Sequence, residues 1–524
     1  MPSKSLERLF SVFGQTEPQF SEEEVLRVNQ VISKFSLVYE KVRNAMDYKE
    51  DHLLRKNALF RLLKRKLFIE KILINQTEEK LAEQIVYEMI RAGYLKNNQV
   101  PKTKIDDLLK VIQKYNKLIQ LSDLNQSQFM QMLELQACEI EEVLVPSTKT
   151  KALIRFAFEV MNPRILSNRG EIDDKEKELQ TYLAVYRVLR KPDEALMSFV
   201  LWNLYYPNWH NADDNLIHAI AKDFDLVNDE IRQQLNHPWK KSLDKLFKKF
   251  AIVFWILEDL IEKDPEAAYE IFDDEELLER EVRKACDERY KVVRKKLTRG
   301  VVRSIVYVFF TKMLLALFLE LPLDMLLKGF INYTALTINI LFPPVLMFFV
   351  AITIRTPGKK NTEMIIKELK VIVFGEDAKK FKLKAPKNRS IVTSVVLNIL
   401  YLMVFAASVY LIVIGLDRID FIWTSALIFV FFLSVVSFFG IRIRKPIKEI
   451  SIEEKRDNIF IMLIDFISLP FATVGQWTSN KFSKINFIAF IFDFIIEAPF
   501  KIFVEVLEDL FGFWREKKEE AYDI

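Results

Sequence analysis

Glycine is scarce in this sequence. Only 11 glycines occur among 524 residues, and they are scattered singly along the chain. Dinucleotide-binding turns (GxGxxG) and phosphate-binding loops (GxxxxGK) both need glycines close together, where the backbone approaches phosphate. The sequence therefore excludes both nucleotide-binding motifs. The scarcity also suits an all-helical chain, because glycine disfavours helix interiors.

Cysteine and histidine are also rare. Two cysteines, Cys138 and Cys286, cannot form a disulfide framework or a CxxC zinc knuckle. Two of the four histidines of the chain contribute to one weak metal-binding pattern: His210, Asp213, Asp214 and His218. A catalytic zinc needs three convergent ligands and an open position, and a helix start capped by Asp213 explains the same residues. No HExxH or GxSxG motif occurs, so we expect no metal, no cofactor and no catalytic residue.

Charge is missing from three long stretches of the C-terminal half, at 331–354, 390–416 and 421–441. Each reaches the roughly 20 residues that a helix needs to cross the hydrocarbon core of a bilayer. A fourth stretch, 301–319, is nearly as apolar but contains Arg303 and Lys312. The sequence therefore predicts an all-α membrane protein with four spans, in a transmembrane domain at 301–445.

Lysine and arginine are distributed unevenly among the loops. The loop at 355–389 is rich in both, whereas 320–330 holds only Lys328 and 417–420 holds only Arg418. Positively charged loops of membrane proteins stay in the cytoplasm. We therefore expect both termini to be cytoplasmic, in the inner membrane of a bacterium. The 355–389 loop would lie against anionic headgroups, at about 1 kcal/mol per basic residue.

The first 300 residues are charged and show helical periodicity. We expect a loose tail at 1–20 and a cytosolic helical domain at 21–300. This domain ends in a charged connector helix at 274–297, where acidic residues precede basic ones by four positions. The net charge of +4 is small for this length, so nucleic acid is not an expected partner.

The last segment, 446–524, contains two apolar stretches that charge interrupts. They are 459–477, which contains Asp465, and 485–503, which contains Asp493 and Glu497. A strip of charge on an apolar helix suits an amphipathic helix in the headgroup plane or a re-entrant helix. It also suits a spanning helix whose strip faces a polar interior, which would raise the number of spans to six.

Four ionisable residues are therefore candidates for polar groups inside the membrane: Lys312, Asp465, Asp493 and Glu497. An unpaired lysine in the middle of a span costs about 2.5–3.5 kcal/mol on insertion scales. One hypothesis pairs Lys312 with one of the three acids, along a polar path. The alternative is that Lys312 extends to the interface or packs beneath the cytosolic domain.

Two adjacent prolines, Pro343 and Pro344, lie in the second predicted span. Each removes a backbone donor, so we expect a kink or a break in the helix. A break can expose carbonyl groups to a transported substrate, although such prolines are more often architectural.

The large polar domain and the short external loops favour a non-enzymatic scaffold or partner-binding membrane protein. It would bind an unknown protein, or itself, through the cytosolic domain. A transporter or channel subunit with a polar path near Lys312 and the acidic C-terminal strip is the alternative. A membrane-bound enzyme that acts on lipid is a third hypothesis.

Overall fold

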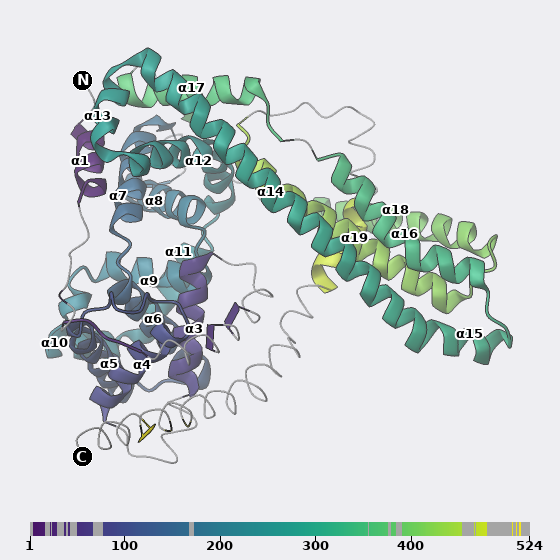
Figure 1. Cartoon of the computed structure of the whole chain (residues 1–524), viewed down its shortest axis with the longest axis horizontal. Helices are drawn as coiled ribbons and strands as arrows, with labels where there is room; N and C mark the ends of the chain where they lie inside the picture. The colour runs from purple at the N-terminus through teal and green to yellow at the C-terminus, as the bar shows by residue number, and fades with distance from the viewer. Residues whose placement is uncertain are drawn as a thin grey trace. The chain divides into compact units, whose positions relative to one another are not determined.

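A computed structural model describes residues 4–15, 21, 24–28, 36–37, 40–41, 50–65, 77–166, 172–354, 356–375, 379–383, 390–452, 466, 468–478, 506, 510 and 513–514. The described residues are almost entirely helical (Figure 1), which confirms the predicted all-α fold. They include one short parallel pair, β1 (Ile165–Leu166) with β2 (Phe381–Lys382). Strands of two residues carry no alternating pattern, so the sequence did not indicate them.

The chain divides into two compact units. The first consists of Ser11–Asp244, Phe381–Leu383 and Phe487–Ile524, and the second of Met1–Phe10, Lys245–Lys380 and Lys384–Asn486. The main division along the chain therefore falls between Asp244 and Lys245, inside helix α12 (Lys240–Lys263). Residue 300 itself lies inside a longer helix that is continuous through this position.

The first unit is a set of amphipathic helices with short connections. Its helices are α3 (Asp51–Arg65), α4 (Glu78–Arg91), α5 (Thr103–Leu121), α6 (Gln126–Leu144), α7 (Thr148–Met161), α8 (Asp174–Arg190), α9 (Glu194–Tyr205), α10 (Asp214–Lys222) and α11 (Phe224–Leu235), with short 3₁₀ turns η2 (Asn162–Arg164) and η3 (Trp209–Asn211). Side chains three and four apart form the buried face of α5, among them Leu108, Ile112 and Tyr115. At α6 a capping box between Asn125 and Gln128 fixes the helix start.

The second unit contains the apolar helices. Its elements are α12 (Lys240–Lys263), which begins in the first unit, α13 (Pro265–Asp273), α14 (Glu275–Leu315), the π-helical turn η4 (Ala316–Glu320), α15 (Leu321–Lys328), α16 (Tyr333–Ile352), α17 (Lys359–Phe374), α18 (Ile391–Asp417) and α19 (Trp423–Glu449). A further helical stretch, the 468–478 helix, follows. Four helical segments are long and apolar enough to cross a membrane, namely Glu275–Leu327, Tyr333–Ile352, Ile391–Asp417 and Trp423–Glu449. The first segment contains the predicted stretch 301–319, and the other three overlap the predicted stretches 331–354, 390–416 and 421–441.

The N-terminal segment differs from the expected loose tail. Residues Lys4–Phe13 form helix α1, in which Leu6, Leu9, Phe10 and Phe13 are buried. The ring of Phe10 lies 4.8 Å from that of Tyr269 and 5.2 Å from that of Phe272, between ring centroids. The spacing of three and four residues makes a short apolar stripe, and burial of this stripe holds a helix that would be marginal alone.

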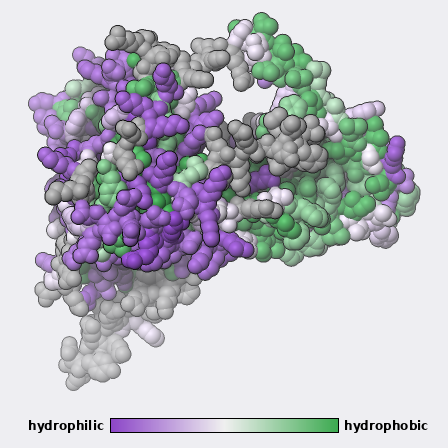
Figure 2. Space-filling view, turned by 90° about the horizontal axis from the view of Figure 1, so that it is seen from above, coloured by the Kyte–Doolittle hydropathy of each residue, from purple (hydrophilic) through white to green (hydrophobic). Residues whose placement is uncertain are grey.

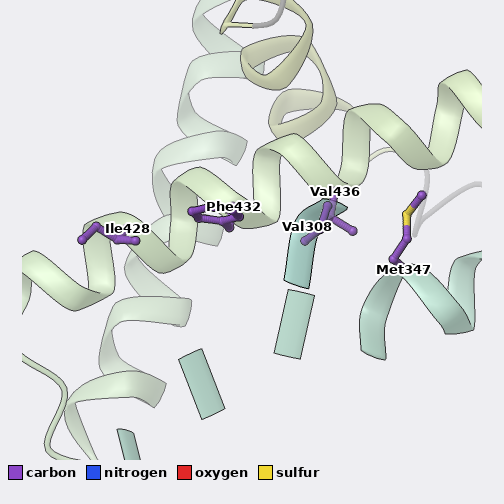
Figure 3. Close-up of a cluster of buried hydrophobic side chains, with 5 residues drawn as sticks. All are labelled: Val308, Met347, Ile428, Phe432 and Val436. Atoms are coloured by element: carbon purple, nitrogen blue, oxygen red, sulfur yellow. The ribbon is translucent and has the colours of Figure 1, made fainter. Parts of the chain in front are cut away.

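The apolar helices α14, α16 and α19 pack on one another. Val308, Met347 and Phe432 form part of a shared buried cluster, and Figure 3 shows Ile428, Phe432 and Val436 in line along α19. Figure 2 shows hydrophobic side chains gathered over the surface that these helices form. Helix α18 is the most exposed of the four, since only 6% of its most apolar window is buried.

A buried asparagine joins three helices at the end of this bundle. The side-chain nitrogen of Asn361 in α17 donates to Tyr290 Oη of α14 (2.8 Å) and to the carbonyl oxygen of Ile450 (2.9 Å), and its Oδ1 accepts from the backbone N–H of Ile452 (2.8 Å). Lys370 of α17 also forms ion pairs with α14, to Glu275 at 2.7 Å. This end of α14, α17 and α19 is therefore held by specific polar contacts.

Candidate functional site: a buried polar cluster and a helix-lined groove

Lys312 lies near the C-terminal end of α14 and is completely buried. Its ammonium group pairs with the carboxylate of Glu320, of which only 2% is exposed. The same nitrogen lies 4.8 Å from the centroid of the Phe432 ring on α19, close enough for a cation–π contact. The lysine therefore has a partner inside the bundle and does not extend to the surface.

The position of Glu320 depends on the π-helical turn η4. In a regular α-helix, residues eight apart are rotated by about 80° from each other. A π-helical turn contains more residues per turn, which brings Glu320 back onto the face of Lys312. Pro322 follows at once, and its missing N–H and its ring favour such a local change of hydrogen bonding. The sequence predicts a loop at 320–330, whereas the chain is helical to Lys328.

Asn339 of α16 completes the cluster. Its side-chain nitrogen donates to the second carboxylate oxygen of Glu320 (2.8 Å) and to the backbone carbonyl of Ser425 on α19 (3.5 Å). These two acceptors fix the orientation of the amide. Asn339 is 1% exposed, and its Oδ1 has no hydrogen-bond partner among the described residues. The cluster of Lys312, Glu320 and Asn339, called here the polar cluster, thus keeps one buried acceptor for a small donor such as water.

The three predicted acidic partners of Lys312 cannot be compared with this arrangement. Asp465, Asp493 and Glu497 lie outside the described residues. Glu320 could have been considered from the sequence, because it is the acid nearest to Lys312 on the C-terminal side. The missing signal was the π-helical turn, which helical periodicity does not indicate.

The two prolines of the second predicted span do not break its helix. Helix α16 continues from Tyr333 to Ile352 with both Pro343 and Pro344 inside it, and both are buried. Packing of α16 against α14 and α19 supports the helix where backbone donors are missing. The alternative of an interrupted helix with exposed carbonyls is therefore not found.

The weak metal pattern is resolved into ordinary contacts. Asp213 caps α10 by accepting from the Leu216 N–H (2.9 Å), and Asp214 pairs with Lys117 (2.6 Å). Nδ1 of His210 lies 3.5 Å from Glu139. Among the described residues, no three His, Cys, Asp or Glu side chains lie close enough to hold a metal ion.

A groove of about 600 Å³ lies in the first unit. Apolar side chains of α9, including Leu196, Phe199, Val200 and Leu204, line it together with Tyr182 and Tyr186 of α8. Charged side chains from α5, α6 and α7 lie around them. Sequence reasoning missed this groove, because its lining residues come from five separate helices.

The charges along the groove are paired with neighbours. Lys151 pairs with Glu142 at 2.8 Å, and Lys104 Nζ donates to the Val143 carbonyl at 2.7 Å. Glu139 accepts from Lys114 at 2.5 Å and from the Trp209 indole N–H at 2.8 Å. What the groove offers to a ligand is therefore mainly its apolar surface.

The buried thiol of the first unit is not reactive. Cys138 is 1% exposed, and burial raises its pKa well above the usual value. A nucleophilic cysteine needs the opposite, a lowered pKa and access to solvent. Cys286 of the second unit is also fully buried.

No protein-family model matches the chain, and no curated protein and no solved structure is significantly similar to it.

Proposed function

We propose that this protein is a multi-pass membrane protein that binds a partner through its first unit. The membrane part would consist of the four apolar segments, in a bacterial inner membrane with the first unit in the cytoplasm. The long uncharged segments and the basic loop at 355–389 support this orientation. Basic residues of that loop are candidates to contact anionic headgroups.

The groove is the observation that carries the binding function. Its volume falls within the range of ligand-binding sites. Side chains of α8 and α9 form its apolar lining, and the charged side chains around this lining pair with neighbouring residues of the protein. A groove of this kind suits the apolar face of an amphipathic helix. We therefore propose that the partner presents such a helix.

Site-specific photo-crosslinking tests this proposal. A photoreactive phenylalanine derivative would replace Leu204, which lines the groove and is 43% exposed. The control position is Leu226 of α11, which is 72% exposed and lies outside the groove lining. In cells of the source organism, position 204 should give one discrete adduct that position 226 does not give. Equal labelling at both positions, or none at 204, would contradict the proposal.

Transport of protons or small cations is a second candidate function. The polar cluster supports it, because ionisable groups inside a bundle of apolar helices commonly mark ion pathways. The unpartnered Oδ1 of Asn339 beside Glu320 offers a place for a water or an ion. The third hypothesis, an enzyme that acts on lipid, has no described residue cluster in its support.

Flux measurements in liposomes test the transport candidate. Proteoliposomes with a trapped pH dye should show protein-dependent proton flux that Lys312→Met abolishes. The matched control is Lys110→Met, since Lys110 of α5 is exposed and far along the chain from the polar cluster. If the wild-type protein shows no flux of protons or of sodium and potassium ions, this candidate fails.

A further inference from the structure

We propose that the 468–478 helix is a fifth membrane segment whose outer face contacts lipid acyl chains. The inference rests on the proposed membrane position of α18 and α19 and goes beyond the four spans. Its partner is the hydrocarbon core of the bilayer, and not the headgroup plane in which an amphipathic helix would lie.

Two contacts place this helix along α18. The ring centroids of Phe471 and Phe405 are 5.3 Å apart, and the hydroxyl of Tyr401 donates to Thr473 Oγ1 at 2.7 Å. As the 468–478 helix advances from 471 to 473, its contacts move back along α18 from 405 to 401. The two helices are therefore antiparallel.

A third contact is made with α19 at a glycine. A Cβ built on Gly475 would lie 2.2 Å from the backbone carbonyl oxygen of Ser434 and 2.8 Å from Phe438 Cβ. No other residue type allows two helix backbones to approach this closely. The 468–478 helix therefore makes its close backbone contact with α19 at Gly475.

The depth of these contacts in the proposed membrane indicates whether hydrocarbon or headgroups surround the 468–478 helix. Phe405 lies in the middle of α18. Ser434 precedes Arg442, the first charge of α19, by eight residues, or about 12 Å along the helix. Headgroup-level contacts would instead fall at the ends of α18 and α19. The 468–478 helix therefore lies at the depth of the hydrocarbon core.

The side chains of this helix agree with that depth. Phe471, Ala472 and Thr478 are buried against the neighbouring helices. On the opposite side Leu469, Val474 and Trp477 are 48%, 36% and 63% exposed, and the uncharged polar residues Thr473 and Gln476 are exposed as well. Residues 468–478 include no charged residue. An exposed, uncharged face on which Leu469, Val474 and Trp477 lie at mid-bilayer depth fits acyl chains, and exposure of these three side chains to water would be unfavourable.

Spin labels measure the depth directly. Val474→Cys would be labelled in the full-length protein, whose two native thiols are buried, and the protein would be reconstituted into phosphatidylcholine vesicles. Collision rates with oxygen, which partitions into lipid, and with a water-soluble nickel chelate would be compared. The references are Met403→Cys in the middle of α18, which is 56% exposed, and Leu226→Cys in the first unit.

The label at 474 should behave like the label at 403, with oxygen collisions exceeding nickel collisions several-fold. If position 474 resembles 226 while 403 remains in lipid, the 468–478 helix is not embedded and only this inference falls. If 403 also resembles 226, the proposed membrane position of α18 fails as well. Trp477→Cys provides a second reporter on the same face should Val474→Cys not fold.

Discussion

At the scale of single residues, the least expected feature is the buried ion pair of Lys312 and Glu320. Two ions removed from water regain stability only if their partners are well placed. Here Asn339 and the ring of Phe432 supply further contacts. Removal of either ion leaves the other buried and uncompensated, which is costlier than removal of both.

A double-mutant cycle should show this coupling. Lys312→Met and Glu320→Gln are each expected to destabilise the protein by about 3–5 kcal/mol, and the double variant by clearly less than their sum. Thermal unfolding of the detergent-solubilised protein measures the effect. The exposed pair Arg155–Glu159 of α7 serves as the control, with an expected coupling of about 0–1 kcal/mol. Additive losses at 312 and 320 would contradict the pairing.

His52 of the first unit predicts a dependence of stability on pH. Burial, together with the nearby Arg190 and Arg55, lowers its pKa from 6.5 to about 4. Between these values the unfolded chain binds more protons than the folded one, so stability falls as the pH drops from 6.5 to 4. Because His52 is only partly buried, the loss should be about 1–2 kcal/mol.

Chemical denaturation at a series of pH values checks this prediction. The free energy of unfolding is compared at pH 7 and pH 4.5 in wild type and in His52→Gln. The part of its pH dependence that His52 contributes should be missing in the variant. His218 of α10, which is exposed, provides the control substitution His218→Gln. An unchanged slope in His52→Gln would show that this imidazole does not titrate as described.

The sequence predicted part of the polar cluster and not the rest. The free-energy cost of an unpaired lysine in a membrane span predicts that Lys312 needs a charged partner. The sequence, however, predicts a loop at Glu320. The reason is the single π-helical turn η4, which changes the face of every residue that follows it. Composition and helical periodicity cannot reveal such a change of phase.

At the scale of elements, the apolar helices were the most predictable part. The uncharged stretches at 331–354 and 390–416 form α16 (Tyr333–Ile352) and α18 (Ile391–Asp417), because a helix pairs the backbone N–H and C=O groups within such an apolar run. Packing between helices was not predictable, since it depends on side chains brought together from distant positions.

Gly475 gives a test of that packing. Gly475→Ala should destabilise the solubilised protein by about 1–3 kcal/mol, because the added Cβ meets the Ser434 carbonyl on α19. The control is Gly415→Ala in α18, where nothing lies within 4 Å of an added Cβ. That substitution should be neutral or slightly stabilising, since alanine favours a helix. Equal melting temperatures for the two variants would contradict the close contact at Gly475.

At the scale of the whole molecule, the sequence separates a charged region from an apolar one, but it does not find where the compact units divide. The long helix α14 carries a charged N-terminal part and an apolar C-terminal part in one continuous element. A change of composition at residue 300 therefore marks a change of surroundings along a helix, and the boundary at Asp244 and Lys245 follows from packing.

We propose that the apolar helices lie in lipid, with the first unit in the cytoplasm. Cysteine labelling tests it most directly, since the native thiols are buried. In spheroplasts, a membrane-impermeant maleimide should label Phe330→Cys, which lies between α15 and α16 and is 59% exposed in the wild type. It should label Leu226→Cys only after permeabilisation. Labelling of Leu226→Cys in intact spheroplasts, or recovery of the protein in buffer without detergent, would contradict the claim.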